Sequence, residues 1–364
     1  MSKYMPSRRQ CLSALACIVA SSGITLSWGA TPNIELLEQA SVISPKWRSL
    51  VQLDVARAGT RLVSVGERGV LGISEDNAKS WRQVKVPVSC TLTRVHFVDE
   101  RVGWVIGHSG VILKTIDAGD TWIKQFDGVA AAQVELAAAK SAQDGAEESQ
   151  RRIEDAQRLV SEGPDKPFLA MQFSDSQRGA VVGAYGLAFR TIDGGSTWRS
   201  MMGELEPANQ RHLYAALQAD SGLLIAGEQG VMVSSLGNEG PYSVIPLQAK
   251  STIFGLLKSG STVIAFGLKG AAFRRVGEGG SWTRIDFPPL SITAGIRMTN
   301  GTLILGNEAG QLFSSEDDGM TFRSLPIRNP EPISGLVEAA DGTIVRAGVR
   351  GVNRIVLGAQ EVRQ

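Results

Sequence analysis

The stretch VVGAYGLAFRTIDGGSTWRSM (181–201) contains the two patterns that decide the fold. Alternating apolar residues lead into Gly183, two further residues and Gly186 follow, and a second alternating run starts at Leu187. Two short strands joined through a glycine-bounded pair predict a tight hairpin, because glycine adopts the positive φ values that such turns need. This segment therefore predicts two neighbouring antiparallel strands.

The same hairpin pattern recurs seven times along the chain. Its first glycines stand at positions 66, 107, 183, 227, 267, 306 and 348. A further short apolar run precedes each glycine pair, and in most copies another run follows it. Four strands in about 40 residues, repeated several times, are typical of a β-propeller. The sequence therefore predicts an all-β fold, a seven-bladed β-propeller over residues 45–362.

The second pattern in the opening stretch is an Asp box, which follows the hairpin. TIDAGDTW (115–122) and TIDGGSTW (191–198) fit Ser/Thr-x-Asp-x-Gly-x-Thr-Trp, and SEDDGMTF (315–322) is a close variant. In such a turn the Asp and Ser/Thr side chains bond backbone groups, and glycine takes an unusual dihedral. One copy per blade at the periphery cannot build a single active site, so we interpret these residues as structural. They are Asp117, Gly119, Trp122, Asp193, Gly195, Trp198, Asp317 and Gly319.

The two ends of the repeat array predict how the ring closes. The seventh repeat ends near residue 362 without a recognisable fourth strand, while WRSL (47–50) stands before the first repeat. That tetrapeptide is almost identical to WRSM (198–201), which begins a fourth strand. We therefore expect an N-terminal strand at 47–50 to complete the last blade, which would leave no open sheet edge.

The one long gap between repeats contains an insertion, residues 127–167, between blades 2 and 3. Its composition is dominated by Ala, Glu, Gln and Arg, which favour helices. Asp144-Gly145 interrupts the segment and Gly163-Pro164 ends it, so we expect a helical hairpin. Two roles stay open for it, a solvated decoration of the propeller and an arm that docks a partner.

The insertion links the fourth strand of one blade to the first strand of the next. In a propeller this connection lies at the same end of the ring as the paired-glycine hairpins. We call this end the arm-bearing rim, and the opposite end, which carries the Asp boxes, the Asp-box rim. Varied and mostly charged side chains around a central channel are typical of a binding surface. The predicted partner-binding residues are Arg68, His108, Tyr185, Arg211, His212, Glu228, Lys269, Arg297 and Arg350.

The first thirty residues predict export. Lys3, Arg8 and Arg9 precede an apolar stretch, the layout of a signal peptide, and the adjacent arginines are similar to a twin-arginine signal. Residues 31–44 are expected to form an N-terminal extension. The near-neutral charge of the chain argues against a nucleic-acid partner. We also expect no cofactor and no metal, because the three histidines lack the spacing of metal ligands.

The repeats, above all VVGAYGLAFRTIDGGSTW (181–198), together with the twin-arginine-like leader, resemble the photosystem II assembly and stability factors over roughly residues 45–358. The resemblance implies an exported, non-enzymatic propeller that binds an integral membrane protein and assists the assembly or stability of its complex. It implies the periplasm, or the thylakoid lumen in a photosynthetic organism, and an arginine patch as the contact surface. Candidates for that patch are Arg68, Arg211, Arg297 and Arg350. We expect a monomer.

Sialidases also carry Asp boxes, so a second class of function stays open, a sialidase-like glycoside hydrolase or a sugar-binding propeller. A sialidase needs an arginine triad that faces a Tyr/Glu nucleophile pair in a central pocket. In this chain Tyr185 with Glu228 is the pairing to test.

Overall fold

The computed structural model describes residues 34–357, apart from 206, 207, 209, 236, 238–240, 248 and 249. The predicted signal peptide at 1–30 and the last predicted propeller residues, 358–362, lie outside the described residues. The described residues belong to one compact unit. Among the residues described, no helix combines the length and the apolar character that crossing a membrane requires.

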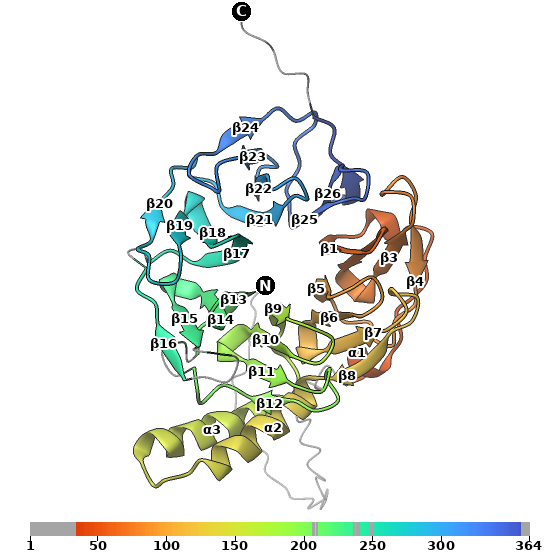
Figure 1. The fold of residues 1–364 in the computed structure, drawn as a ribbon. Helices are drawn as coiled ribbons and strands as arrows, with labels where there is room; N and C mark the ends of the chain where they lie inside the picture. Colours follow the sequence, from red (N-terminus) through yellow and green to blue (C-terminus); the bar gives the residue numbers. More distant parts are fainter. Residues whose placement is uncertain are drawn as a thin grey trace, which may run out of the picture. The chain divides into compact units, whose positions relative to one another are not determined.

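Seven antiparallel sheets surround a common axis, which confirms the predicted all-β, seven-bladed propeller (Figure 1). The first strand of each sheet is innermost and contacts the first strands of the neighbouring sheets. From the centre outwards, the sheets are β1 (Gln52–Ala58), β2 (Arg61–Gly66), β3 (Leu71–Ser74), β4 (Arg82–Val84); β5 (Leu92–Phe97), β6 (Gly103–Gly107), β7 (Ile112–Thr115), β8 (Ile123–Phe126); β9 (Phe168–Phe173), β10 (Gly179–Gly183), β11 (Ala188–Thr191), β12 (Arg199–Ser200); β13 (Leu213–Gln218), β14 (Leu223–Gly227), β15 (Met232–Ser235), β16 (Tyr242–Val244); β17 (Ile253–Ser259), β18 (Thr262–Gly267), β19 (Ala272–Val276), β20 (Thr283–Arg284); β21 (Ile292–Arg297), β22 (Leu303–Asn307), β23 (Leu312–Ser315), β24 (Arg323–Leu325); and β25 (Gly335–Glu338), β26 (Ile344–Gly348), β27 (Gly351–Arg354).

The core lies between the blades, because both faces of each sheet pack against a neighbour. The second strands show this most clearly, since every residue of β6 is buried. Between blades 2 and 3 the ring of Trp104 stacks on Phe173 with a centroid distance of 3.7 Å. A strand that is buried on both faces needs a continuous apolar run, as in Trp104-Val105-Ile106, whereas the sequence analysis described alternation before each glycine pair.

The hairpin turns need their two glycines for different reasons. In blade 3 the N–H of Ala184 donates to the Pro167 carbonyl at 3.0 Å, so the turn lies against the start of β9. A Cβ added to Gly183 would lie 2.2 Å from that carbonyl oxygen. Tyr185 and Gly186 both have positive φ, 55° and 75°, as in a type I′ turn. The first glycine therefore permits a close approach, and the second permits the left-handed backbone.

The Asp-box turns form one hydrogen-bond network several times. In blade 3 Oδ1 of Asp193 accepts the Thr191 hydroxyl at 2.8 Å and the Thr197 N–H at 2.9 Å, and Oδ2 accepts the Thr197 hydroxyl at 2.6 Å. The Thr191 oxygen in turn accepts the Gly195 N–H at 2.8 Å. Burial alone would raise the pKa of Asp193, but the hydrogen bonds from Thr197 and Thr191 outweigh it and lower the pKa to about 2. The same bonds surround Asp76, Asp117 and Asp317.

The predicted closing strand at 47–50 is wrong. Trp47–Ser49 form a short 3-10 turn, and among the described residues the seventh sheet has three strands. If residues 47–49 formed the outer strand of blade 7, the chain would then have to cross to the innermost strand β1, a distance of three strand spacings or about 14 Å. The two residues between this turn and β1 reach about 11 Å. Residues 85–91 make the equivalent connection from β4 to β5.

The ring closes through direct contacts between blades 7 and 1 instead. Strands β25 and β26 contact β1, and the Ser334 hydroxyl donates to the Gln52 carbonyl at 2.8 Å. Farther out, Arg354 Nη1 donates to the Asn77 carbonyl at 2.5 Å. The buried ring of Trp47 lies against Gly72 of β3, where a Cβ would meet it at 2.3 Å. Side chains thus supply the closure that we had expected from a strand.

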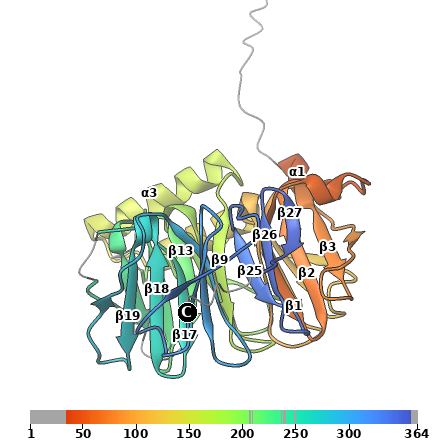
Figure 2. The ribbon, with the colours of Figure 1, turned by 90° about the horizontal axis from the view of Figure 1, so that it is seen from above.

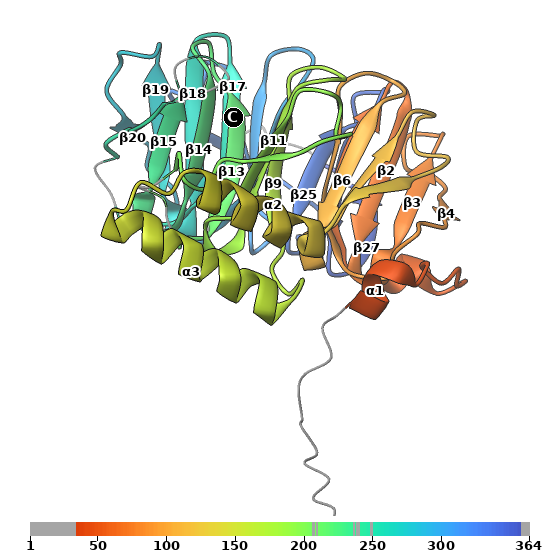
Figure 3. The ribbon, with the colours of Figure 1, turned by 90° about the horizontal axis from the view of Figure 1, so that it is seen from below.

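Two helices, α2 (Gly128–Ser141) and α3 (Glu147–Glu162), occupy the insertion between β8 and β9. They lie at the same end of the ring as α1 (Ile34–Glu38) (Figures 2 and 3). Asp127 caps α2 by accepting the N–H groups of Val129 and Ala130, both at 3.1 Å. Helix α2 contacts the blade-2 hairpin turn at 108–110, so the insertion and the hairpin turns share one rim.

A buried carboxylate fixes this helical arm to the propeller. Glu135 on α2 is only 2% exposed and accepts hydrogen bonds from Arg152 Nε at 2.8 Å and Nη2 at 3.1 Å on α3. It also accepts the hydroxyl of Ser200 on β12. One side chain thus links both helices to the outer strand of blade 3, so the arm has a defined position on the ring.

Candidate functional site

Eight of the nine predicted partner-binding residues lie on or beside the turns of the arm-bearing rim. Arg297 does not, and this assignment was wrong. It is the last residue of β21, a strand that runs away from the arm-bearing rim. Its Nε donates to the Ser259 hydroxyl at 3.3 Å, and that hydroxyl in turn donates to Asp318 in an Asp-box turn. Arg297 therefore belongs to the Asp-box rim.

Four of the eight meet between blades 3 and 4. The Tyr185 N–H donates to Nδ1 of His212 at 3.0 Å, and the two rings meet edge to face with centroids 4.7 Å apart. Oε2 of Glu228 accepts the His212 N–H at 2.9 Å. Arg211 contributes its carbonyl to the Gly186 N–H at 2.8 Å. Tyr185 is held in the left-handed region by this frame, and the residue is 55% exposed.

The aromatic contacts continue from His212 to the innermost strands. The His212 ring lies 6.2 Å from Tyr214 on β13, and Tyr214 lies 5.4 Å from Phe254 on β17. Burial, followed by the negative charge of Glu228, raises the pKa of the Tyr214 phenol, so it stays protonated at neutral pH. We call Tyr185, His212, Tyr214 and Phe254 the aromatic row. It crosses three blades, from the exposed rim to the first strands.

The arm meets the aromatic row at Lys166, directly after α3. Its Nζ lies 5.6 Å from the centroid of the Tyr185 ring, a cation–π geometry. It also donates to Glu162 at 2.5 Å and to Asp165 at 2.8 Å. Burial would lower the pKa of Lys166, but these hydrogen bonds outweigh it and raise the pKa, so the amine stays charged. The row and the arm therefore form one surface.

The sequence reasoning did not assign Lys166, Tyr214 or Phe254 to the partner-binding rim. Phe254 had a signal, since it follows the first residue of β17 as Tyr214 follows the first residue of β13. No pattern in the sequence marks Lys166, because it reaches Tyr185 only where the chain returns from α3 to blade 3. The remaining predicted residues, Arg68, His108, Lys269 and Arg350, project separately from the turns of blades 1, 2, 5 and 7.

The hydrogen bond that Glu228 accepts from the His212 N–H argues against a catalytic role for Glu228. Its bond to the His212 N–H recurs in other blades: Glu67 accepts the Val51 N–H and Glu308 accepts the Ser291 N–H, both at 3.0 Å. In each case the glutamate ties a hairpin turn to the residue before the first strand. A group with the same task in three blades is part of the repeat, which disfavours the Tyr185–Glu228 pair as a sialidase centre.

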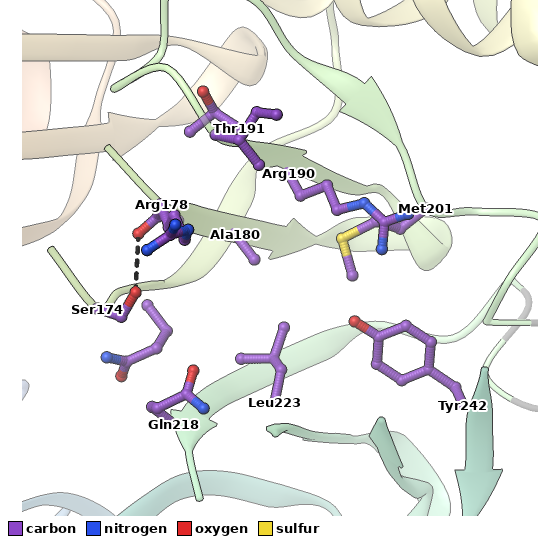
Figure 4. Close-up of a pocket in the computed structure, with 12 residues that line it drawn as sticks. Ser174, Arg178, Ala180, Arg190, Thr191, Met201, Gln218, Leu223 and Tyr242 are labelled. Carbon is purple, nitrogen blue, oxygen red and sulfur yellow. Dashed lines mark hydrogen bonds between the residues drawn. The ribbon is translucent and has the colours of Figure 1, made fainter. Parts of the chain in front are cut away.

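A cavity of about 70 Å³ lies between blades 3 and 4 near the Asp-box rim (Figure 4). Arg190 reaches into it and donates from Nη2 to Glu204 at 2.9 Å, and the Tyr242 hydroxyl points toward the same space. Burial, only partly offset by the charge of Arg190, raises the pKa of Tyr242 to about 12. Ligand pockets commonly enclose about 300 Å³ or more. This cavity is therefore too small for a sugar substrate. In the part of the chain that the structure describes, no three His, Cys, Asp or Glu side chains are placed to hold a metal ion.

The fold and the site define a class of protein: a seven-bladed propeller that presents aromatic and cationic side chains beside a helical arm. Residues 73–144 match the family described as "Photosynthesis system II assembly factor YCF48". A curated relative, the chloroplastic photosystem II stability/assembly factor HCF136 of Guillardia theta, is 39% identical over 49 residues. That match covers 13% of this chain and 12% of the relative's length.

Solved structures show the same architecture across most of the chain. The structure "YCF48 bound to D1 peptide" superposes with a TM-score of 0.60 at 12% identity, over 88% of this chain and 94% of that one. A streptogramin B lyase superposes with a TM-score of 0.64 at 10% identity, over 84% of this chain and 93% of that one. At these identities the likeness shows the propeller fold alone. The family model is matched over residues 73–144, so the sequence similarity to photosystem II assembly factors covers part of the propeller.

Proposed function

We propose that this protein is an exported, non-enzymatic propeller that binds an integral membrane protein and assists the assembly or stability of its complex. The observation that carries this proposal is the contact between the aromatic row and the arm, Lys166 above Tyr185. It makes the arm part of one rigid surface with the exposed end of the row. A related propeller is named for its complex with the D1 peptide, which supports a peptide segment as the kind of ligand.

The chemistry of the surface suits a protein segment. Tyrosine supplies a large contact area with little loss of conformational entropy, and exposed tyrosine and arginine residues often dominate the energetics of protein interfaces. Tyr185 is already ordered by its backbone bond to His212, so binding would cost little further ordering. Lys269 and Arg350, on the turns of blades 5 and 7 of the same rim, would steer an acidic segment toward it.

The leader and one curated relative support the proposed site of action. A charged and then apolar N-terminus precedes the propeller, and the curated relative is chloroplastic. We place the protein in the periplasm, or in the thylakoid lumen if its source is photosynthetic, where the rim would meet the exported face of a membrane protein. We expect it to act as a monomer, without a cofactor and without nucleic acid.

Affinity capture from detergent-solubilised membranes tests the proposal. The full chain carries a tag, and recovered proteins are quantified by mass spectrometry. We compare the unaltered protein with Tyr185→Gly and Ser109→Gly. Both positions have φ near 55–58°, so glycine relieves backbone strain in either case. Because Ser109 is buried and cannot contact a partner, Ser109→Gly controls for the change in the backbone alone.

We expect the unaltered protein and Ser109→Gly to recover the same integral membrane protein. Recovery by Tyr185→Gly should fall at least about tenfold, because an interface tyrosine is lost. Recovery of no membrane protein would contradict the proposed function. Equal recovery by all three proteins would leave membrane-protein binding intact but remove the aromatic row from it.

A further inference from the structure

The third strand of blade 7 has an open outer edge at Val352 and Arg354, whereas farther along the chain Leu357 forms an isolated antiparallel bridge with Ile327. The Ile355 N–H donates to the Ile344 carbonyl at 2.8 Å, which marks 344 and 355 as a hydrogen-bonded pair. Bonded and non-bonded pairs alternate along an antiparallel ladder. Arg354 pairs with Val345 and Val352 pairs with Ala347, so both of these pairs are non-bonded. The backbone N–H and C=O groups of Val352 and Arg354 therefore point away from β26.

In complete blades the fourth strand satisfies these groups. The residue after the fourth strand donates its N–H to the carbonyls of Ala188, Met232 and Ala272 in blades 3, 4 and 5, at 2.9 Å in each case. Val352 has the equivalent register, since it pairs with Ala347 as Ala188 pairs with Val182. Among the described residues, no backbone N–H donates to the carbonyl of Val352. One strand is missing at this edge.

A cavity of about 340 Å³ lies along the open edge, between β27 and blade 1. It is lined by the strand residues Val352 and Arg354, and by Trp47, Arg48, Gln52 and Trp81. Gln52 is fully buried, yet neither atom of its side-chain amide has a partner among the described residues, and the same is true of Trp81 Nε1. Buried polar groups normally have partners. Those atoms are sealed from the cavity, whereas the N–H and C=O groups of Val352 and Arg354 at the edge call for a ligand that both accepts and donates hydrogen bonds, as a peptide backbone does.

The charges of the residues that line the cavity indicate the charge of its ligand. Arg48, Lys79, Arg350 and Arg354 line it, and none of the described lining residues is acidic. Arg350 and Arg354 have acidic partners outside the lining, Glu331 and Asp341, both at 3.1 Å. Arg48 Nη2 donates to the Trp81 carbonyl at 2.6 Å and has no acidic partner among the described residues. The lining of the cavity is therefore positive beside a strand edge that lacks its partner.

From the open edge and the positive cavity, we propose that an extended acidic peptide segment of a partner protein binds here and forms the fourth strand of blade 7. Its backbone pairs with Val352 and Arg354, and its acidic side chains face Arg48 and Lys79. This is β-strand addition, in which backbone hydrogen bonds give affinity and the flanking side chains give specificity. The site is separate from the aromatic row, and neither proposal depends on the other.

Amide hydrogen exchange of the full chain, followed by NMR, tests the proposal with a synthetic peptide of alternating Glu and Val. We expect the peptide to slow exchange at Val352 and Arg354 at least tenfold. A peptide of alternating Lys and Val should have no effect, because like charges face it. Binding of the acidic peptide without protection of these two amides, or no binding at all, would overturn the proposal.

Charge reversal supplies the matched variants. Arg48→Glu combined with Lys79→Glu should weaken binding of the acidic peptide at least tenfold. Arg323→Glu should not, although Phe322-Arg323-Ser324 in blade 6 corresponds to Trp47-Arg48-Ser49. Protection that needs no added peptide and disappears on deletion of residues 358–364 would assign the edge to the chain's own C-terminus. Protection that increases with protein concentration would assign it to a second copy. Either result would overturn the proposal.

Discussion

The two rims of the propeller are built from the same repeat but preserve different parts of it. On the Asp-box rim the side chains repeat, since Asp76, Asp117, Asp193 and Asp317 make the same hydrogen bonds. On the arm-bearing rim the backbone repeats while the side chains at the turn tips differ, apart from the glutamates that accept the same N–H in three blades. Arg68, Ser109, Tyr185, Gln229 and Lys269 share a φ between 54° and 58°. A fixed frame with variable side chains is suited to binding, whereas repeated side chains serve the fold.

The largest effect is expected where the arm-bearing rim depends on its backbone frame. Gly183→Ala places a methyl group 2.2 Å from the Pro167 carbonyl oxygen, and the backbone must shift to relieve the clash. We expect a loss of about 4 kcal/mol in the free energy of unfolding, measured by urea titration. Gly279→Ala is the control, because its Cβ would meet no atom within 4 Å. Equal stability of the two variants would show that the frame is not constrained.

The next effect concerns how firmly the helical arm is attached to the propeller. Glu135→Ala leaves the Arg152 guanidinium and the Ser200 hydroxyl without their shared partner. Breaking a largely buried ion pair should cost about 2.5 kcal/mol in the free energy of unfolding. It should also expose the 128–162 segment to limited proteolysis. Glu154→Ala on the exposed side of α3 should change neither quantity, and equal cleavage of both variants would contradict the clamp.

A smaller effect is expected from a single Asp box. Asp193→Ala removes the acceptor of the Thr197 N–H and hydroxyl and of the Thr191 hydroxyl. We expect a loss of about 1.5 kcal/mol by urea titration, with recovery of the membrane partner unchanged. The exposed Asp286, changed to Ala, serves as the control. A stable Asp193→Ala protein that no longer recovers the partner would reverse the roles given to the two rims.

The smallest effect is a dependence of stability on acid. The pKa values of Asp193 and Asp317 lie at about 2 in the folded protein, below the ordinary value near 3.9 in an unfolded chain. The folded state therefore binds these protons less readily, and the stabilisation is complete above about pH 4. It should decline as the pH falls toward 2, by less than about 1 kcal/mol per box because the turns are exposed to solvent. Urea titrations of the unaltered protein and of Asp317→Asn between pH 5 and 2 measure this decline. If the free energy of unfolding depended on pH identically in both proteins, the lowered pKa of Asp317 would be contradicted.

The sequence predicted the blades because the requirements behind them are local. A glycine that must approach a carbonyl and an Asp that must bond its own turn leave a mark within a few residues, as Gly183 and Asp193 do. The order of strands then follows from the spacing of these marks. The helices of the insertion could be predicted for the same reason, from composition and the Asp144-Gly145 break.

Predictions that depended on distance through space were less successful. The sequence Trp47-Arg48-Ser49 is similar to that of a fourth strand. The two residues between it and β1 are too few to lead from an outer strand to an innermost one. Arg297 was placed on the wrong rim because its position at the end of β21, not its charge, decides where it lies. Lys166 reaches Tyr185 only because the arm returns beside blade 3.

Photo-cross-linking from both rims tests the central claim most directly, that the arm-bearing rim binds the membrane partner. A photoreactive amino acid replaces Tyr185 in one protein and Met320, an exposed residue of an Asp-box turn, in another. Each is exported in cells and irradiated in intact membranes, and adducts are identified by mass spectrometry. We predict an adduct with an integral membrane protein from position 185 and none from position 320. An adduct from position 320 alone would contradict the account.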